Sequence, residues 1–452
     1  MLIDMFATRK LALTGALILS GGLLAASPAS AATTDSTRTP VSPAYAVTLT
    51  SDTAGGTWTG HESVSFTNAS AVPLAEVYLR LWDNFHGSCP STPVTVGNVT
   101  GGTASALSVT CTALKVTLPT PLAQNRSASI GFDLRIVVPD GIDRFGHDGP
   151  YYFIGNALPV LAVRDAKDWH LDPYTNNGES FYSVISDFDV RLDHPSTLSV
   201  PATGTSVDTP GSTGRTVTRA TATKVRDFAW GAGPFRKISG TSPAGVRVNV
   251  YSVGSISTSS AQSMLNLSTS ALDAHARRFG AYPYGEADVV LDNGFWFGGM
   301  EYPGFVLDRV SSTALAHELA HQWWYGIVGD DEYSTPWLDE GFTDYATDLY
   351  FNQTRTGCGI TWQSSAERLT NSMAYWDAHP SRYGTVVYGY GKCTLHDLRR
   401  LIGDTKMASL MSSYARSHWF GVSTVADFKA AAQAAAGTTD LTSFWTQHRV
   451  IG

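Results

Sequence analysis

Two histidines one helical turn apart, with a glutamate beside the first, are the residues of this sequence best suited to chemistry. The segment HELAHQWWYG places His317 and His321 four positions apart. On an α-helix both imidazoles then project from one face and can converge on one point. Neutral imidazoles are ligands that zinc prefers. The spacing therefore predicts a metal-binding helix.

A catalytic zinc site needs three protein ligands and one open position. The segment STPWLDEGFTDY supplies Glu340, which eighteen residues separate from His321, in a helix expected to open at Thr335 and Pro336. We predict that His317, His321 and Glu340 hold one Zn²⁺ per chain. Glu318 is next to a ligand without being one, so it is the natural general base, which takes a proton from water and later returns it to the leaving amine.

The segments around these residues resemble the zinc aminopeptidase N family of gluzincin metallopeptidases. HELAHQWW is similar to the family's zinc helix, and WLDEGFTDY to its segment around the third ligand. Upstream, GGMEYPG resembles the family's substrate-edge motif GxMEN, and downstream VVYGYGKCTLHDLRRL resembles the segment that carries a catalytic tyrosine. The four motifs occur in the family's order and cover residues 298 to about 400. The first half is similar more loosely, through LPVLAV and DFDVRL.

The resemblance implies a role for a tyrosine in the downstream motif. Tyr388 would donate a hydrogen bond to the oxygen that gains negative charge during hydrolysis. From the residues alone, Tyr383 and Tyr390 are equally eligible.

The upstream motif implies the residues that hold the substrate. Glu301 would bind the free α-ammonium group by a charge-assisted hydrogen bond. Gly298, Gly299 and Met300 would form a strand edge that pairs with the main chain of the substrate.

The sequence departs from the family at several points. Tyr302 replaces an asparagine of GxMEN, and Tyr325-Gly326 replaces the usual Gly-Asn after the zinc helix. No counterpart of the family's N-domain TQxE segment occurs near YYFIGNALPV. The sequence also stops at Gly452, where family members continue into a helical domain, so we expect a more open cleft.

Three functions follow from these patterns. The first is an aminopeptidase that hydrolyses N-terminal residues from peptides. The second is an endopeptidase or leader-processing protease that uses the same zinc site. The third is a non-catalytic binding scaffold, which would have lost a ligand or the base.

Composition favours an exported protein without a nucleic-acid partner. The 452 residues carry 15% charged residues, a formal net charge of −8 and no long basic run. Arg9 and Lys10 precede the apolar run LALTGALILSGGLLAA, which ends at Ala29-Ser30-Ala31. This pattern predicts a signal peptide over residues 1–31, secretion, and no stable membrane insertion after cleavage. The oligomeric state stays open.

The four cysteines, in an oxidising compartment, predict structural disulfides. Three pairings are possible, and proximity in sequence favours Cys89 with Cys111 and Cys358 with Cys393.

We expect an α+β fold in two domains. After a flexible leader, residues 32–44, short alternating runs such as YAVTLT, SVSFTN and ASIGFDLRIVV predict an antiparallel β domain over 45–240. The stretch ISGTSPAGV at 238–246 reads as a linker. Helical periodicity then predicts a catalytic domain over 241–452, mostly α-helical, which the resemblance implies to be thermolysin-like.

Overall fold

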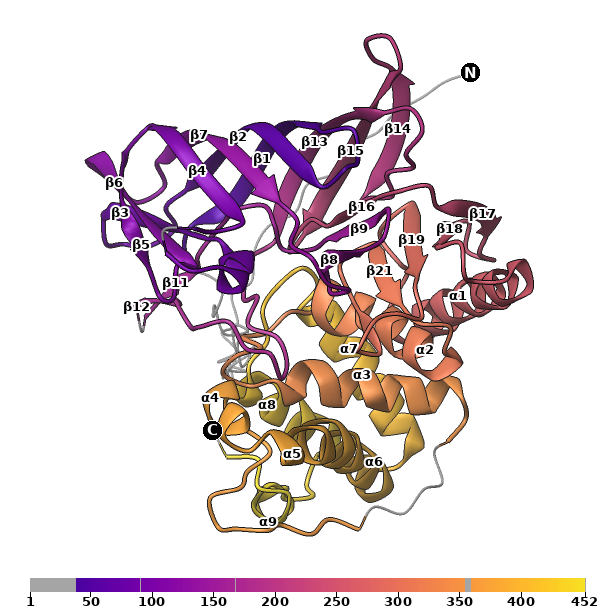
Figure 1. Cartoon of the computed structure of the whole chain (residues 1–452). Coiled ribbons are helices and arrows are strands. Elements are labelled where there is room, and N and C mark those ends of the chain that lie inside the picture. Colours follow the sequence, from indigo (N-terminus) through magenta and orange to yellow (C-terminus); the bar gives the residue numbers. More distant parts are fainter. Residues whose placement is uncertain (1–37, 90, 167, 354–358, 452) are drawn as a thin grey trace, which may run out of the picture. The chain divides into compact units, whose positions relative to one another are not determined.

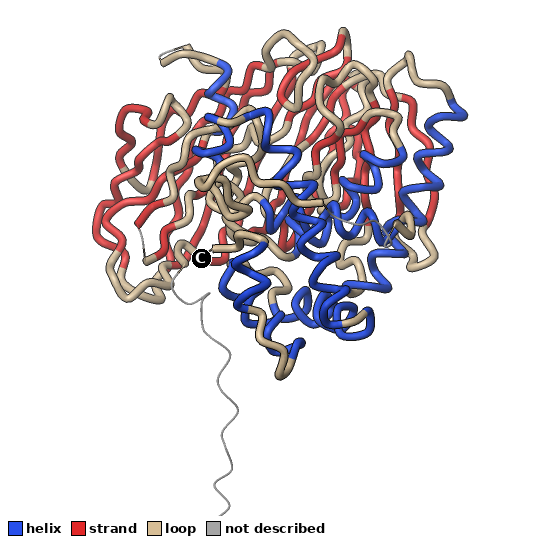
Figure 2. Tube along the Cα trace, turned by 90° about the horizontal axis from the view of Figure 1, so that it is seen from below, coloured by secondary structure: helices blue, strands red, loops and turns tan. Residues whose placement is uncertain are grey.

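The computed structural model describes residues 38–451 except 90, 167 and 354–358. The predicted signal peptide, residues 1–31, lies outside the described residues. The described residues belong to one compact unit. Strands dominate its first half and helices its second (Figures 1 and 2), so the predicted α+β fold is confirmed. No helix in the described part of the chain has the length and apolar character needed to span a membrane.

The first half consists mainly of two antiparallel-rich sheets. The larger has the strand order β14-β15-β13-β1-β2-β7-β4, and the smaller the order β10-β3-β6-β5. Only β1 and β13 in the larger sheet run parallel to each other. The bounds are β1 Val41–Ser51, β2 Thr57–Thr67, β3 Leu74–Arg80, β4 Val94–Thr100, β5 Thr103–Ser108, β6 Ala113–Leu122, β7 Ser127–Val137, β10 Val160–Leu161, β13 Ser186–Pro195, β14 Thr205–Pro210 and β15 Arg215–Val225.

Alternation of buried and exposed residues explains why these segments form strands. In β1 every second side chain from Pro43 to Ser51 is buried, which is the period of a strand with one solvated face. Trp58 and Val64 of β2 pack in one apolar core with Val77 and Leu79 of β3. The inner faces of the two sheets therefore share a core.

The predicted flexible leader, residues 32–44, was wrong for its last part. β1 already begins at Val41, and the backbone of Thr39 pairs with that of Arg164 through hydrogen bonds of 2.8 and 2.7 Å. The Thr39 hydroxyl also donates to Asn68, 3.1 Å away. Polar, proline-containing composition suggested disorder, but tertiary pairing orders the segment.

The second half opens with a mixed five-stranded sheet, ordered β17-β18-β19-β21-β20. Figure 1 shows α1 and α2 beside this sheet. The predicted linker at 238–246 was wrong, because its first residues belong to β17 and the rest form the turn into β18. Pro243 and Gly245 lie in that turn. The predicted domain boundary at 240/241 thus falls inside β17. The bounds are β17 Arg236–Thr241, β18 Arg247–Ser252, β19 Glu286–Leu291, β20 Gly299–Met300 and β21 Phe305–Asp308.

Short strands and nine α-helices complete the described residues. Helix α1 is capped by Ser257, whose side chain accepts from the Ser260 backbone, and is ended by Gly280. The helix after Thr335 begins at Trp337, with Pro336 rather than Thr335 at the cap. The bounds are β8 Phe145–Asp148, β9 Tyr151–Ile154, β11 Arg164–Asp165, β12 Asp168–Trp169, β16 Trp230–Ala232, α1 Thr258–Phe279, α2 Ser312–Ala320, α3 Trp337–Tyr350, α4 Met373–Ala378, α5 Pro380–Tyr383, α6 Gly391–Ile402, α7 Asp404–Ser417, α8 Val425–Ala436 and α9 Thr442–Gln447.

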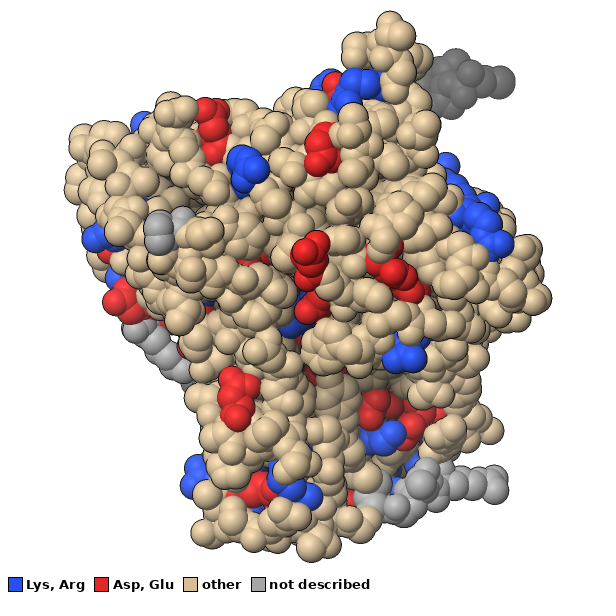
Figure 3. Space-filling view, in the orientation of Figure 1, with Lys and Arg blue, Asp and Glu red and all other residues tan. Residues whose placement is uncertain are grey.

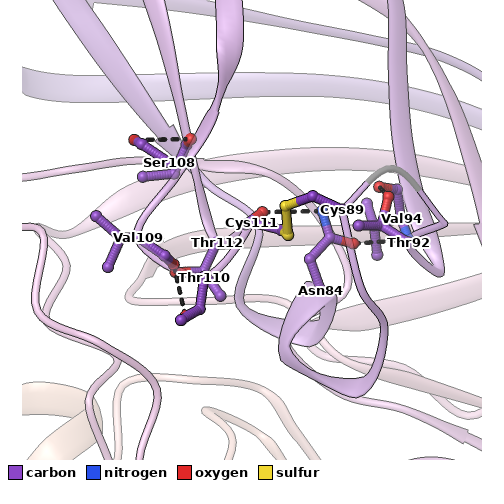
Figure 4. Close-up of a disulfide and its surroundings, with 10 residues drawn as sticks. Asn84, Cys89, Thr92, Val94, Ser108, Val109, Thr110, Cys111 and Thr112 are labelled. Carbon is purple, nitrogen blue, oxygen red and sulfur yellow. Dashed lines mark hydrogen bonds between the residues drawn. A yellow bond between two sulfur atoms is a disulfide. The ribbon is translucent and has the colours of Figure 1, made fainter.

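A disulfide joins Cys89 to Cys111, as predicted (Figure 4). Asn84 braces the same region: its side-chain amide donates to the Cys111 carbonyl at 3.2 Å and accepts from the Val94 backbone at 2.9 Å. The second predicted disulfide involves Cys358, which lies outside the described residues.

His170 links the β-rich half to the loop before α3. Its ring lies 3.0 Å from an oxygen of Asp165 and 3.4 Å from one of Asp331. Burial by itself lowers the pKa of His170, but hydrogen bonds and charge from Asp331 and Asp165 outweigh it and raise the pKa above its usual value. Asp331 also accepts from the Ser334 backbone at 3.2 Å, so the contact supports the turn that leads into α3.

We predict that His170→Gln destabilises the protein more in mild acid than in mild alkali. A raised folded-state pKa gives stability that is complete below the unfolded value of about 6.5 and is lost as the pH rises through the folded value. The free energy of unfolding should fall by about 1 to 2 kcal/mol at pH 6 and by less at pH 9, measured by urea denaturation. His61→Gln removes an exposed histidine–aspartate pair, so it should cost less than about 0.5 kcal/mol. Equal losses for His170→Gln at both pH values would contradict the assignment.

Candidate metal centre and catalytic site

Helix α2 presents the two histidines and the intervening glutamate. Its first turn is capped by Ser311, whose hydroxyl accepts from the Ala314 backbone at 3.3 Å. His321 is the C-cap residue, directly after the last helical residue Ala320, and a π-helical turn over 322–327 follows. The chain leaves helical geometry within that turn, at Trp324 and Tyr325.

The structure brings together the three predicted ligands. Nε2 of His317 and Nε2 of His321 lie 3.0 Å apart. Oε2 of Glu340, from the first turn of α3, lies 3.0 Å from the former and 3.2 Å from the latter. Three ligand atoms from two consecutive helices therefore meet at one point.

This triangle fits a zinc ion. Bonds of 2.0 to 2.1 Å in tetrahedral geometry separate ligand atoms by about 3.3 Å, close to the distances found here. Two imidazoles and one carboxylate are also the donor set of a catalytic zinc site. His317, His321 and Glu340 are thus able to hold the ion and leave a fourth position open.

Carboxylates behind the imidazoles orient both rings. Nδ1 of His317 lies 2.9 Å from Asp344, and Nδ1 of His321 lies 2.6 Å from Asp339. Burial lowers the pKa of His317, but Asp344 and Glu340 outweigh it and raise the pKa to about 10. Burial raises the pKa of Glu340, but the two histidines hold it well below its usual value. The surroundings thus favour positive charge at this point, which a divalent cation supplies.

Glu318 lies beside the triangle and is almost completely buried, with 5% of its surface exposed. Burial raises the pKa of its carboxyl to about 8, and the nearby acid Glu301 adds to the effect. A Cβ on Gly299 would lie 2.4 to 2.5 Å from the Glu318 side chain, so only glycine at 299 leaves room for this carboxyl group. The predicted base and the predicted strand edge therefore meet directly.

A cavity of about 490 Å³, the site cavity, surrounds these groups. His317, Glu318, His321 and Glu340 line its floor. Trp296 and Phe297 line it too, and Trp296 is 64% exposed. Elsewhere on the face shown in Figure 3, basic and acidic side chains lie in small separate groups of both signs.

Of the three eligible tyrosines, Tyr388 is the one that lines the site cavity. Its ring stacks on that of His317 with centroids 5.7 Å apart, and its hydroxyl donates to Glu340. The Tyr383 hydroxyl is buried against Gly178, and the Tyr390 hydroxyl donates to the Thr361 carbonyl at 2.8 Å. The position of Tyr388 in the cavity thus distinguishes it from Tyr383 and Tyr390, which the sequence left equally eligible.

The predicted substrate edge is strand β20, the last strand of its sheet. Gly299 and Met300 pair with β21 on one side, and Gly298, Gly299 and Met300 line the site cavity. Glu301 also lines the cavity, and its Oε1 is buried without a hydrogen-bond partner among the described residues. A ligand amine is the kind of donor that this oxygen lacks.

The β-rich half contributes site residues that the sequence interpretation missed. Glu179 and Arg144 line the cavity, and they form an ion pair of 3.0 Å with side chains 13% and 11% exposed. Burial, followed by the charge of Glu301, raises the pKa of Glu179 well above its usual value. No motif in the sequence marks either residue. Glu179 lies in NNGES, downstream of YYFIGNALPV, and NNGES does not match the family's TQxE segment.

Tyr302 and Tyr325, two departures from the family pattern, serve the packing around the site. Tyr302 is fully buried against Gly155, where a Cβ would lie 1.9 Å from its hydroxyl. The Tyr325 hydroxyl donates to Asp227, and its carbonyl accepts from Arg226 at 2.7 Å.

Residues 263–448 match the Peptidase family M1 domain. Aminopeptidase M1-B of Oryza sativa subsp. japonica is 23% identical over 252 residues, which cover 48% of this chain and 29% of that protein. Aminopeptidase N of Bos taurus is 27% identical over 225 residues, covering 43% and 23%. The aligned part is thus less than a third of either relative. The crystal structure of an M1 zinc metallopeptidase from Deinococcus radiodurans has a TM-score of 0.66 at 18% identity and covers 92% of this chain and 93% of that one, so the fold is shared.

Proposed function

We propose that this chain, which carries a peptidase family M1 domain, is a secreted zinc-dependent aminopeptidase that removes N-terminal residues from peptides. The observation that carries the proposal is the triangle of His317, His321 and Glu340, with Glu318 beside it in one cavity. Secretion is inferred from residues 1–31 of the sequence.

The chain's own residues supply binding, proton transfer and orientation. When bound by His317, His321 and Glu340, zinc supplies Lewis acidity that activates water and polarises the scissile carbonyl. Glu318 accepts the proton of the attacking water and delivers it to the leaving amine.

The Tyr388 hydroxyl donates a hydrogen bond to the substrate oxygen as that oxygen gains charge. Burial, followed by the charge of Glu340, raises the pKa of Tyr388 well above its usual value, so the phenol keeps its proton. One such donor is worth about 3 kcal/mol of transition-state stabilisation.

Two acids hold the substrate amine at one end of the site cavity. Glu301 and Glu179 come from opposite halves of the chain, and the charge of Glu301 raises the pKa of Glu179. An α-ammonium group between them would relieve this repulsion and form charge-assisted hydrogen bonds. β20 would then pair with the substrate main chain, which sets the first peptide bond over the metal.

We predict that Glu318→Gln keeps zinc and loses turnover. Glu318 is not one of the three ligands, so metal analysis should still give zinc near one per chain. The value of kcat for an aminoacyl anilide should fall by about 10² to 10⁴, the worth of a general base. Glu340→Gln is the contrast, because it should lose zinc as well, as a chelator does to the wild type. A Glu318→Gln protein that hydrolyses at the wild-type rate would refute the role of Glu318.

Tyr388→Phe should lower kcat by about 10² to 10³ with little change in KM, because the lost hydrogen bond acts on the transition state. Tyr390→Phe is the matched control: it removes a hydroxyl from the same segment that bonds to Thr361, so kcat should stay at the wild-type value. If both variants keep full activity, another group donates to the oxygen.

The requirement for a free amine is tested with peptides and their N-acetylated forms. Acetylation removes the charge that Glu301 and Glu179 would bind, so hydrolysis should cease. Glu301→Gln should raise KM for free peptides by about 10- to 100-fold, the loss of a hydrogen bond to a charged group. Cleavage of acetylated and free peptides at equal rates would instead identify an endopeptidase.

A further inference from the structure

A second cavity, of about 790 Å³, lies among α1, α3, α6 and α7. None of the described residues that line it also lines the site cavity. Both cavities border α3: Glu340 and Asp344 face the site cavity, and Tyr345 and Leu349 face the second one. At about 100° per residue, Glu340 and Leu349 lie on opposite sides of the helix. The second cavity is therefore a separate place on the molecule, here named the arginine cavity.

Four arginines and a single acidic residue line the arginine cavity. The arginines are Arg277, Arg278, Arg399 and Arg416, and the acid is Asp404. The chain as a whole has a net charge of −8, so the lining of this cavity is more positively charged than the average surface.

Two of the arginines are paired with acids. Arg277 pairs with Asp273 one helical turn away, and Arg399 pairs with Asp404 at 2.8 Å. Their charges are thus offset within the protein.

The other two arginines bond to neutral groups. Arg278 donates to the carbonyls of Ala274 and Leu349, each at 3.0 Å, and Arg416 donates to the Ser412 hydroxyl at 2.6 Å. Within the described ranges, no carboxylate lies at ion-pair distance from Arg278 or Arg416. Burial, followed by the charge of Arg277, lowers the pKa of Arg278, which is the effect expected where no anion compensates a half-buried cation.

The floor of the arginine cavity is partly apolar. Phe279, Tyr345 and Met411 line it but are only 1 to 2% exposed, so the apolar surface that a ligand can reach belongs to Leu349, which is partly buried, and Ala408, which is exposed. A free inorganic anion would use the guanidinium groups and leave this floor in contact with water. A ligand that carries both a carboxylate and an apolar body matches both features, because guanidinium binds carboxylates in a fixed bidentate geometry and the floor gains from burial of apolar surface.

We propose that the arginine cavity is a binding site for a small ligand with one carboxylate and an apolar body, such as an N-acylated amino acid or the C-terminal residue of a peptide. Arg278 and Arg416 bind the carboxylate, and the apolar body packs on Leu349 and Ala408. The inference stands apart from the proposed hydrolysis, because it uses none of the residues of the site cavity.

The test is calorimetric titration of the full chain with N-acetyl-L-phenylalanine. Its blocked amine removes the group that Glu301 would bind, and its amide analogue lacks the charge. We expect the acid to bind with an affinity that falls as salt rises, and the amide and inorganic phosphate to bind at least about tenfold more weakly.

Arg416→Gln should weaken binding of the acid about tenfold or more. This residue is exposed, so the variant is expected to fold; Arg278→Gln tests the half-buried partner. Arg236→Gln, an exposed arginine on β17, is the matched control and should bind as the wild type does. Glu340→Gln should also bind the acid normally, even if the hydrolase proposal fails. Equal affinity for acid and amide, or an Arg416→Gln protein that binds the acid as tightly as the wild type, would overturn the proposal.

Discussion

Burial of several like charges at one point is the constraint on which this structure depends. Ionised carboxylates cost much free energy in a medium of low polarity unless cations or hydrogen bonds compensate them. The acids of the region whose pKa burial raises are Glu179, Glu301, Glu318, Asp330, Glu332 and Asp339. Their repulsion makes the region a strong attractor for positive charge. Positive charge that compensates these acids can come from the imidazoles of His317 and His321, the guanidinium of Arg144 or a divalent cation.

The β-rich half takes part in this balance. Arg144 compensates Glu179 directly, and its guanidinium also bonds to the Tyr174 hydroxyl at 2.9 and 2.6 Å. Arg226 reaches from the same half to the carbonyl of Tyr325, just beyond the helix that carries His317. A second half deprived of these contacts would leave buried acids and backbone oxygens without donors. The site therefore belongs to both halves of the chain, whichever boundary is drawn between them.

Local patterns allowed the triangle of His317, His321 and Glu340 to be predicted, and long-range placement was beyond their reach. The one-turn spacing of His317 and His321 is fixed by helix geometry, and their Nε2 atoms lie 3.0 Å apart in the structure; their role as metal ligands stays a prediction. No periodic pattern in the sequence marks Glu179, because only the folded chain brings it into the same cavity as Glu301. The linker prediction failed because glycine and proline mark tight hairpin turns as well as flexible connections. The last residues of the leader are ordered by tertiary partners, from Asn68 to Arg164 along the chain.

Next to Glu340, two glycines, Gly341 and Gly391, make a close backbone contact. A Cβ on Gly341 would lie 3.0 Å from the backbone of Gly391 in α6, and a Cβ on Gly391 would lie 2.9 Å from Gly341. The backbones of α3 and α6 therefore approach each other as closely as the chain permits, immediately after the third ligand. A Cβ at 341 would require the two backbones to separate by a few tenths of an ångström, immediately beside Glu340. The glycine in WLDEGF is therefore explained by packing between α3 and α6.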